Sequence, residues 1–274
     1  MVRIGYNLWS KPNALHHVGV FDSNFVYCKR FGSNMSAASS TLAFWQNPVG
    51  VDILHDPLKF LYITDEAEHM MVSWLAHRVF DYQQKYGGSE RQFTKMIMIT
   101  MGALLPGVLL QDYITHCATP DMPDIEFGTF GVKCYVGPGQ PLQHPEIVQP
   151  LSIDVRGHTV GMIEDLIDLG GTARFVRDTL TSPQYGARDV VIIAPYRKSA
   201  AATGEMDAIT FGLIPHDTWV ITPRERVETM VKRVPFWAQN GADRATCITN
   251  LRRIGYPQYL IDDWFDTAWM RVDI

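Results

Sequence analysis

The chain has few cysteines, and their spacing is not that of a zinc site. Only four of its 274 residues are cysteine, with no CxxC pair and no histidine at ligand spacing beside them, so we expect no zinc site. These residues are Cys28, Cys117, Cys134 and Cys247. Cys134 alone lies in a region with candidate functional residues, and we expect it to be an ordinary reduced thiol.

Positive charge is also scarce. The 24 Lys and Arg are outnumbered by 29 Asp and Glu, which gives a formal net charge of -5, and the cations form no long run. Polynucleotide binding depends on clustered cations, so we expect no polynucleotide partner. No segment reaches the length of a membrane span or has the pattern of a secretory leader. We therefore expect no membrane partner and a cytoplasmic location, with small-molecule chemistry or protein partners.

Apolar runs and helical patterns alternate through the middle of the chain. A helix is predicted from the N-cap Thr64 to the stop at Gly87–Gly88. Strands are predicted at 96–100 and in the segments GVKCYV, HTVGMIED, DVVIIAPY, AITFGLIP and TWVITP. Continuous apolar strands separated by helices are typical of an open, mostly parallel α/β sheet with helices on both faces.

Three regions are predicted: an N-terminal extension (1–58), an α/β core (59–225) and a small C-terminal helical appendage (226–274). The appendage contains the helical patterns DRATCITNLRRIG and PQYLIDDWFDTAW. Its aromatic residues are Trp237, Tyr256, Tyr259, Trp264, Phe265 and Trp269. We expect them to form a packing surface, with a surface for a partner or a second copy as the alternative.

The stretch VGMIEDLIDLGGTARFV, Val160–Val176, joins an apolar strand to a helix through two adjacent acids and a glycine-rich turn. Ligands of open α/β sheets bind at the carboxyl ends of the strands, where Glu164 and Asp165 (the acid pair) are expected. Backbone N–H groups of residues 169–172 can converge at the helix start and bind a phosphate dianion. Adjacent carboxylates suit a sugar diol, or a metal ion bound to that diol. The segment therefore predicts a site for a phosphoribosyl group.

Within this stretch, MIEDLIDLGGTA resembles the phosphoribosyl pyrophosphate (PRPP) signature of the type I phosphoribosyltransferase family. It is most similar to the bacterial xanthine-guanine and hypoxanthine members. TMGALLPGVLLQDYI resembles the family's pyrophosphate loop and following helix, and IPHDTWVITPRE resembles the stretch that closes its purine pocket. The resemblance covers Leu61 to Glu225. It implies Mg²⁺-dependent transfer of a 5-phosphoribosyl group from PRPP to a nucleobase, a 6-oxopurine, giving a nucleoside 5′-monophosphate and pyrophosphate.

The resemblance also assigns roles to residues at matching positions. The acid pair would bind the ribose hydroxyls. The 5-phosphate would be held by Leu169, Gly170, Gly171 and Thr172. The pyrophosphate loop would be Thr100, Met101, Gly102 and Ala103, with a strained or cis peptide bond before or after Met101. Asp168 matches a carboxylate near purine N7, where it could take the proton that the base loses; the alternative is that it orders the loop.

Further matches concern the base and the metal. Lys198 corresponds to a lysine that donates to the exocyclic oxygen of the base, with Arg197 as a competing choice. Trp219 corresponds to an aromatic residue that stacks on the purine, and a core tryptophan is the alternative. Glu225 stands where the family has an aspartate that helps to hold Mg²⁺. The expected metal set is therefore the acid pair, Glu164 and Asp165, together with Glu225.

The Gly- and Pro-rich segment from Phe127 to Val148 resembles the mobile hood that shields the reaction centre of the family from water. Lys133 and Tyr135 could contact the leaving pyrophosphate, and a purely structural loop is the alternative. The resemblance also implies a homo-oligomer.

Two positions depart from the family pattern. Met101 stands where relatives carry Arg or Lys, which removes a cation beside a leaving group that gains negative charge. Leu169 replaces a Thr or Ser and so removes a hydroxyl donor to the 5-phosphate. Both changes favour a second hypothesis, a regulator that binds a nucleotide without turning it over. A third is an enzyme with an unusual base or ribosyl donor. Retention of Asp168 and Trp219 favours the enzyme.

Overall fold

The computed structural model describes residues 42–120, 122–137, 140–199, 201 and 207–272, without the side chains of 134–137 and 140–144. The chain divides into two compact units, Met1–Thr41 and Leu42–Ile274, and the second contains all the described residues. Most of the predicted extension, including Cys28, therefore lies outside the described residues. Cys117 is a free, exposed thiol and Cys247 a free, buried one.

The main sheet has the predicted α/β character. Its strands are β3 (Phe93–Thr100), β4 (Glu126–Gly137), β5 (Gln140–Gln149), β6 (Thr159–Ile163), β7 (Leu166–Ile167), β8 (Asp189–Lys198) and β9 (Ala208–Ile214). The order is β5-β4-β3-β6-β8, and both β7 and β9 pair with β8. Every described pairing in this sheet is parallel except β4 with β5. An open, mostly parallel sheet is therefore confirmed.

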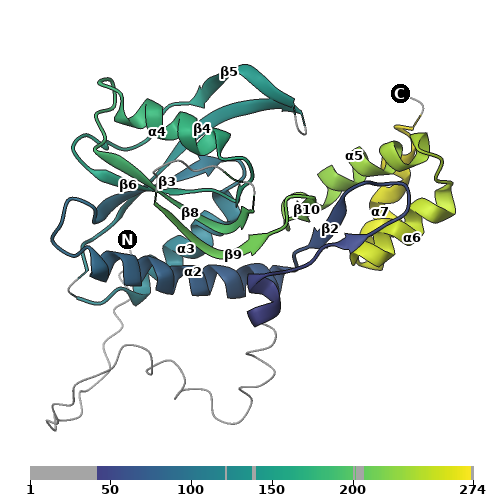
Figure 1. Ribbon diagram of the computed structural model, residues 1–274, viewed down its shortest axis with the longest axis horizontal. Coiled ribbons are helices and arrows are strands. Elements are labelled where there is room, and N and C mark those ends of the chain that lie inside the picture. Colours follow the sequence, from purple (N-terminus) through teal and green to yellow (C-terminus); the bar gives the residue numbers. More distant parts are fainter. Residues whose placement is uncertain (1–41, 121, 138–139, 200, 202–206, 273–274) are drawn as a thin grey trace, which may run out of the picture. The chain divides into compact units, whose positions relative to one another are not determined.

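Three helices cover this sheet. They are α2 (Asp65–Lys85), α3 (Leu104–Cys117) and α4 (Gly171–Thr181). Figure 1 shows α2 and α3 on one face of the sheet and α4 on the other. The predicted cap of α2 is present, since Thr64 Oγ1 accepts a 3.1 Å hydrogen bond from the N–H of Ala67. The central strand β6 is buried along its whole length, as expected for a parallel strand covered on both sides.

A second, smaller sheet combines segments from the two ends of the described chain. It contains β1 (Val51–Asp52), β2 (Lys59–Tyr62) and β10 (Thr218–Ile221). Three helices follow it: α5 (Arg226–Gln239), α6 (Arg244–Ile254) and α7 (Gln258–Trp269). The two predicted C-terminal helices correspond to α6 and α7, and α5 was not predicted. The boundaries predicted at 58 and 225 stay predictions.

The small sheet and the C-terminal helices share one apolar core, which includes Phe60, Ile221, Trp237 and Phe265. A buried ion pair lies beside it. Asp56, whose side chain is fully shielded, accepts hydrogen bonds from Arg233 Nε at 2.9 Å and Trp237 Nε1 at 2.7 Å. The packing prediction for the aromatic residues is confirmed for the buried Trp237, Tyr256 and Phe265, whereas Tyr259 and Trp264 are exposed.

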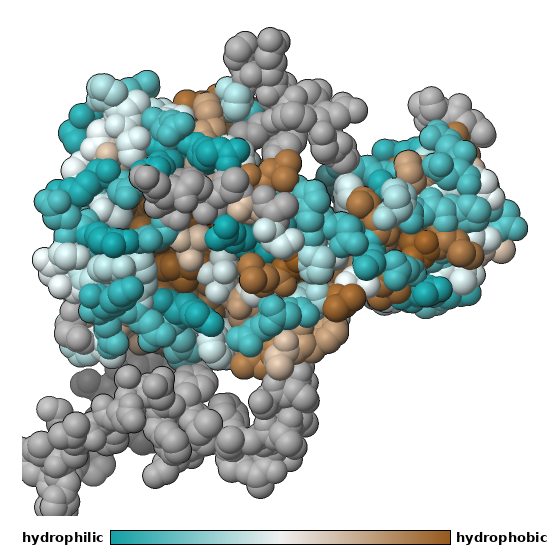
Figure 2. Space-filling model, in the orientation of Figure 1, coloured by the Kyte–Doolittle hydropathy of each residue, from teal (hydrophilic) through white to brown (hydrophobic). Residues whose placement is uncertain are grey.

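Polar residues dominate much of the surface. On the face shown in Figure 2, hydrophilic side chains surround smaller groups of hydrophobic ones, an ordinary surface for a folded domain. Among the described residues, none of the helices combines the length and the apolar character that crossing a membrane requires.

Candidate phosphoribosyl site

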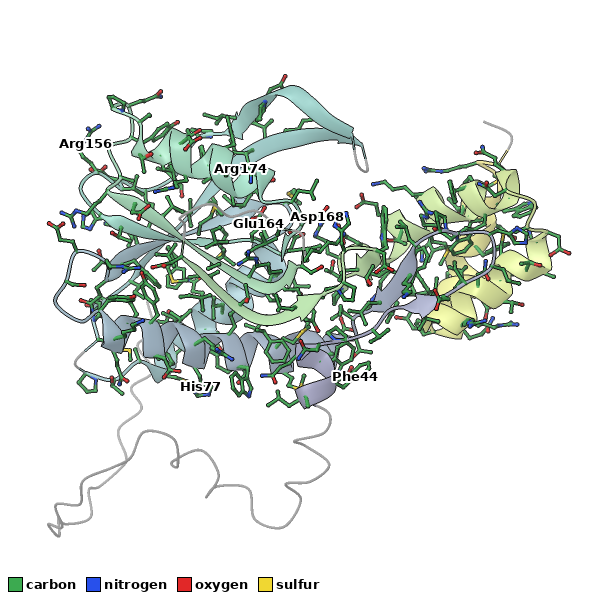
Figure 3. All side chains as sticks on the ribbon, in the orientation of Figure 1. Phe44, His77, Arg156, Glu164, Asp168 and Arg174 are labelled. Atoms are coloured by element: carbon green, nitrogen blue, oxygen red, sulfur yellow. The ribbon has the colours of Figure 1, made fainter. Side chains whose placement is uncertain are left out.

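Three predicted segments meet at one edge of the main sheet. Strands β3, β6 and β8 are neighbours and parallel, so their carboxyl ends lie together. The segment 100–103 follows β3, the acid pair follows β6, and Lys198 ends β8. Figure 3 shows Glu164 and Asp168 near each other at this edge. This is the position where open α/β sheets bind ligands.

The loop 100–103 packs directly against Asp165 of the acid pair. The Thr100–Met101 peptide bond is cis, one of the two positions expected. Met101 is 69% exposed, whereas Ala103 is buried and its N–H donates to the Ile99 carbonyl at 3.0 Å. A Cβ atom on Gly102 would lie 2.5 Å from Asp165 Oδ2. Only a residue without a side chain therefore fits between this loop and Asp165 unless something moves.

The two acids of the pair lie in different environments. Glu164 is only 8% exposed. Burial, reinforced by the charge of Asp165, raises the pKa of Glu164 to about 8 against an opposing hydrogen bond with Thr172. Asp165 is more open: its Oδ1 accepts a hydrogen bond from the Leu166 N–H at 2.9 Å and its Oδ2 one from Arg224 Nη2 at 3.1 Å. Glu164 thus favours its neutral form at neutral pH. The Asp165 carboxylate is instead fixed by hydrogen bonds from the Leu166 N–H and Arg224.

The turn into α4 contains the glycine conformation that the predicted anion cradle needs, and anion binding there stays a prediction. Gly170 has φ 76°, in the left-handed region, and α4 begins at Gly171. The first N–H groups of a helix have no partner within it and carry the positive end of its dipole. Leu169 is 47% exposed, and Arg174 Nη1 donates to the Leu169 carbonyl at 3.4 Å. Thr172, the expected hydroxyl donor, is engaged by Glu164.

Asp168 and Lys198 form an ion pair, with Lys198 Nζ 2.9 Å from Asp168 Oδ1. The Lys198 side chain is 13% exposed and that of Asp168 is 46% exposed. The contact is electrostatic, because Asp168 Oδ1 lacks a directed hydrogen bond within the described residues. Arg197 instead donates to the Ala201 carbonyl at 2.9 Å. Of the two predicted alternatives, Lys198 is therefore the cation beside Asp168.

Arg224, which sequence reasoning missed, connects two of the predicted metal ligands. Its Nη2 lies 3.1 Å from Asp165 Oδ2 and 2.7 Å from Glu225 Oε1. Burial raises the pKa of Glu225, although Arg224 opposes this. No group of three or more His, Cys, Asp or Glu side chains suited to a metal ion occurs within the described part of the chain. A guanidinium thus lies where the expected set would converge.

Trp219, predicted to stack on the base, lies on β10 in the small sheet. Its indole N–H donates to Thr229 Oγ1 at 3.2 Å, and the Arg233 guanidinium lies 5.4 Å from the ring centroid. These contacts join Trp219 to α5. The contacts of Trp219 within the described residues do not include Asp168 or Lys198, so base stacking stays a prediction.

The predicted hood is a β-hairpin formed by β4 and β5, whose pairing contains register shifts (Figure 1). Lys133 is exposed on β4. The side chain of Tyr135 lies outside the described residues, as does that of Cys134.

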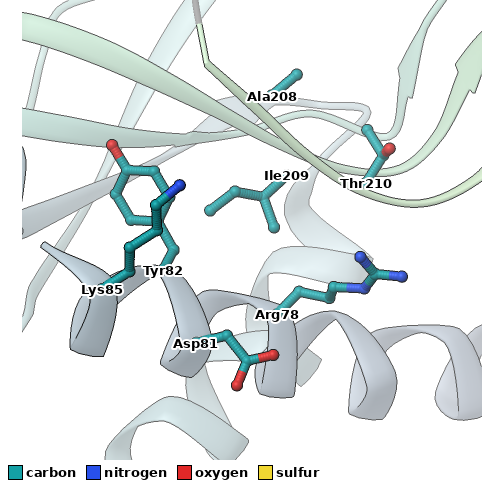
Figure 4. Close-up of a pocket in the computed structure, with 7 residues that line it drawn as sticks. All are labelled: Arg78, Asp81, Tyr82, Lys85, Ala208, Ile209 and Thr210. Carbon is teal, nitrogen blue, oxygen red and sulfur yellow. The ribbon is translucent and has the colours of Figure 1, made fainter.

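The described cavities lie away from this edge. One of 310 Å³ lies between α2 and β9, with Arg78, Tyr82 and Lys85 of α2 facing Ile209 (Figure 4). Another of 460 Å³ is lined by Phe80, Gln83 and residues of the segment between α3 and β4. Neither of these two cavities is lined by a residue of the candidate site.

The chain is similar to several solved structures at low sequence identity. A purine phosphoribosyltransferase from Pyrococcus horikoshii matches with a TM-score of 0.44 and 20% identity, over 60% of this chain and 92% of that one. A hypothetical protein from Neisseria gonorrhoeae with bound ppGpp matches with a TM-score of 0.46 and 18% identity, over 62% and 92%. A hypoxanthine phosphoribosyltransferase from Staphylococcus aureus matches with a TM-score of 0.44 and 18% identity, over 59% and 80%.

No protein-family model matches the chain, and no curated protein matches it in sequence. Purine and hypoxanthine phosphoribosyltransferases are thus among the solved structures to which the chain is similar. The roles of individual site residues depend on the geometry described above.

Proposed function

We propose that the protein transfers a 5-phosphoribosyl group from PRPP to a nucleobase, a 6-oxopurine, with release of pyrophosphate. The observation that supports this most strongly is the contact between loop 100–103 and Asp165. In this proposal the loop binds pyrophosphate and the neighbouring acid pair binds the ribose, at the strand edge that also carries Asp168. Each segment alone is a common nucleotide-binding element; their convergence matches the parts of a single donor molecule.

The described side chains have separate tasks in this proposal. The start of α4 binds the 5-phosphate through backbone N–H groups. Glu164, neutral at neutral pH, and Asp165 bind the ribose hydroxyls. Lys198 donates to the exocyclic oxygen of the base, and Asp168 takes the proton that the attacking ring nitrogen loses. The Asp168–Lys198 ion pair keeps both groups close together before the base arrives.

We expect a magnesium ion to arrive with the substrate, because the described residues contain no group of three or more His, Cys, Asp or Glu side chains suited to a metal ion. Mg²⁺ is usually bound through one or two carboxylates together with substrate phosphates, and Asp165 and Glu225 can supply those carboxylates. The ion would neutralise charge on the pyrophosphate as it leaves. A cytoplasmic location and a homo-oligomeric state remain predictions.

One observation favours the alternative of a nucleotide-binding regulator. Met101 is 69% exposed, so the loop presents an apolar side chain where a leaving pyrophosphate would need a cation. A regulator of this kind would retain the phosphate cradle and bind a nucleotide without turnover.

The experiment that decides between them is a one-pot reaction with PRPP, Mg²⁺ and a mixture of purine and pyrimidine bases, read by mass spectrometry. The wild-type protein should convert one base to its 5′-monophosphate, and Asp168→Asn should do so much more slowly. If no nucleotide forms while PRPP or a nucleotide still raises the thermal unfolding temperature, the regulator replaces the enzyme.

A further inference from the structure

The loop 100–103 presents no cationic side chain of its own. Its residues are Thr, Met, Gly and Ala, Met101 is exposed, and the Ala103 N–H already donates to the Ile99 carbonyl. When the C1–O bond of the donor breaks, its electron pair stays on the pyrophosphate. A positive group fixed beside that oxygen is the usual means of stabilising such charge.

Arg224 carries a positive charge close to this loop. Asp165 Oδ2 is the shared neighbour: it accepts the hydrogen bond from Arg224 Nη2 and lies against Gly102. Glu225 Oε1 accepts a second hydrogen bond from the same nitrogen, at 2.7 Å. Two carboxylates on different segments thus fix the guanidinium beside the loop.

The guanidinium keeps donors available for a ligand. It has five N–H groups, and its hydrogen bonds within the described residues use Nη2 alone. Nη1 lies 3.9 Å from Glu228, and the side chain is 31% exposed. A planar guanidinium with unused donors suits phosphate oxygens.

Other nearby cations have different partners. Lys198 is paired with Asp168. Arg226 is 13% exposed and lies 3.1 Å from Asp65, with its guanidinium over the Tyr62 ring. Both are engaged by these contacts, whereas Arg224 contacts Asp165, the residue that the loop packs against.

We infer that Arg224 supplies the positive charge that loop 100–103 lacks and binds the pyrophosphate of the donor. This inference rests on the proposed function, since it deepens the description of the same site. In the transfer, the C1–N bond to the base forms, the C1–O bond breaks, the base proton passes to Asp168, and Arg224 binds the pyrophosphate that departs.

The test measures binding of inorganic pyrophosphate, in the presence of Mg²⁺, by isothermal titration calorimetry. Arg224→Gln should weaken binding about tenfold, the loss of one charge-assisted contact. Arg244→Gln, which removes an exposed arginine paired with Asp266 in the C-terminal helices, should leave it unchanged. Adding Met101→Arg to Arg224→Gln should restore binding by returning a cation to the loop.

Two results would overturn the inference. In the first, Arg224→Gln binds pyrophosphate as tightly as the wild type. In the second, the binding lost in Arg224→Gln is not restored by Met101→Arg, which would make Arg224 a structural clamp. If Arg224→Gln does not fold, phenylglyoxal modification of the wild-type protein gives the answer. Pyrophosphate should protect Arg224 from modification, and lack of protection contradicts the inference. Failure of the proposed function is seen separately, as absence of nucleotide in the one-pot reaction while pyrophosphate binding still depends on Arg224.

Discussion

Gly102 lies directly against Asp165, which makes Gly102→Ala a direct test of the contact between the loop and this acid. The added Cβ would lie 2.5 Å from Asp165 Oδ2, 2.8 Å from Cγ and 3.1 Å from Oδ1. All three distances are shorter than ordinary van der Waals contact. Because Asp165 is held by the Leu166 N–H and Arg224, either the loop or the carboxylate must move.

Overpacking of this kind costs about 1–3 kcal/mol of unfolding free energy. A displacement of about 1 Å at a reacting site can lower the rate about 100-fold, so nucleotide formation should fall by more than lost stability explains. Urea denaturation and initial rates of nucleotide formation measure the two effects. Gly87→Ala is the matched control, since its Cβ would meet the Gln84 carbonyl at 3.4 Å. Wild-type stability and rate in Gly102→Ala would refute the contact.

Three further predictions concern the charged groups. Asp168→Asn should slow single-turnover nucleotide formation about 100-fold or more without weakening PRPP binding; an unchanged rate would remove Asp168 from proton transfer. The pKa of Glu164 is about 8 in the folded state and near 4.5 when unfolded, so the folded state binds the extra proton and stability falls between these pH values as pH rises, by up to about 1.4 kcal/mol per unit. Glu164→Gln should flatten this dependence in urea titrations at pH 5.5 and 7.5, and equal slopes would contradict it. Asp56→Asn should destabilise by about 3–5 kcal/mol, since it leaves Arg233 buried and unpaired, whereas exposed Asp217→Asn should cost less than about 1 kcal/mol; similar losses would contradict the assignment.

Local signals in the sequence predicted much of the main sheet. The apolar runs that became β6 and β8 are continuous because both strands are buried, and Thr64 reads as a cap because its hydroxyl satisfies a free N–H of α2. The turn at Gly170 was predicted because its left-handed backbone requires glycine. These features depend on neighbours in the chain.

Features that depend on distant residues were missed. The TWVITP segment reads as one more strand of the main sheet, but it forms β10 beside β2 in the small sheet, and periodicity cannot distinguish two sheets. From the sequence alone, Arg224 would be taken for a surface arginine beside the acid Glu225. Its contact with Asp165 exists only because the end of β10 approaches the end of β6. The one signal available was its position directly before Glu225, at the end of a predicted strand.

Group transfer at the candidate site of the main sheet is tested most directly by a measurement that follows the ribosyl group itself. PRPP with a ¹³C-labelled ribose is incubated with the protein, Mg²⁺ and a 6-oxopurine, and labelled nucleotide and pyrophosphate are quantified together. The proposal predicts that both products appear in equal amounts, with the label in the nucleotide. Absence of labelled nucleotide, while PRPP still stabilises the protein against heat, would contradict it.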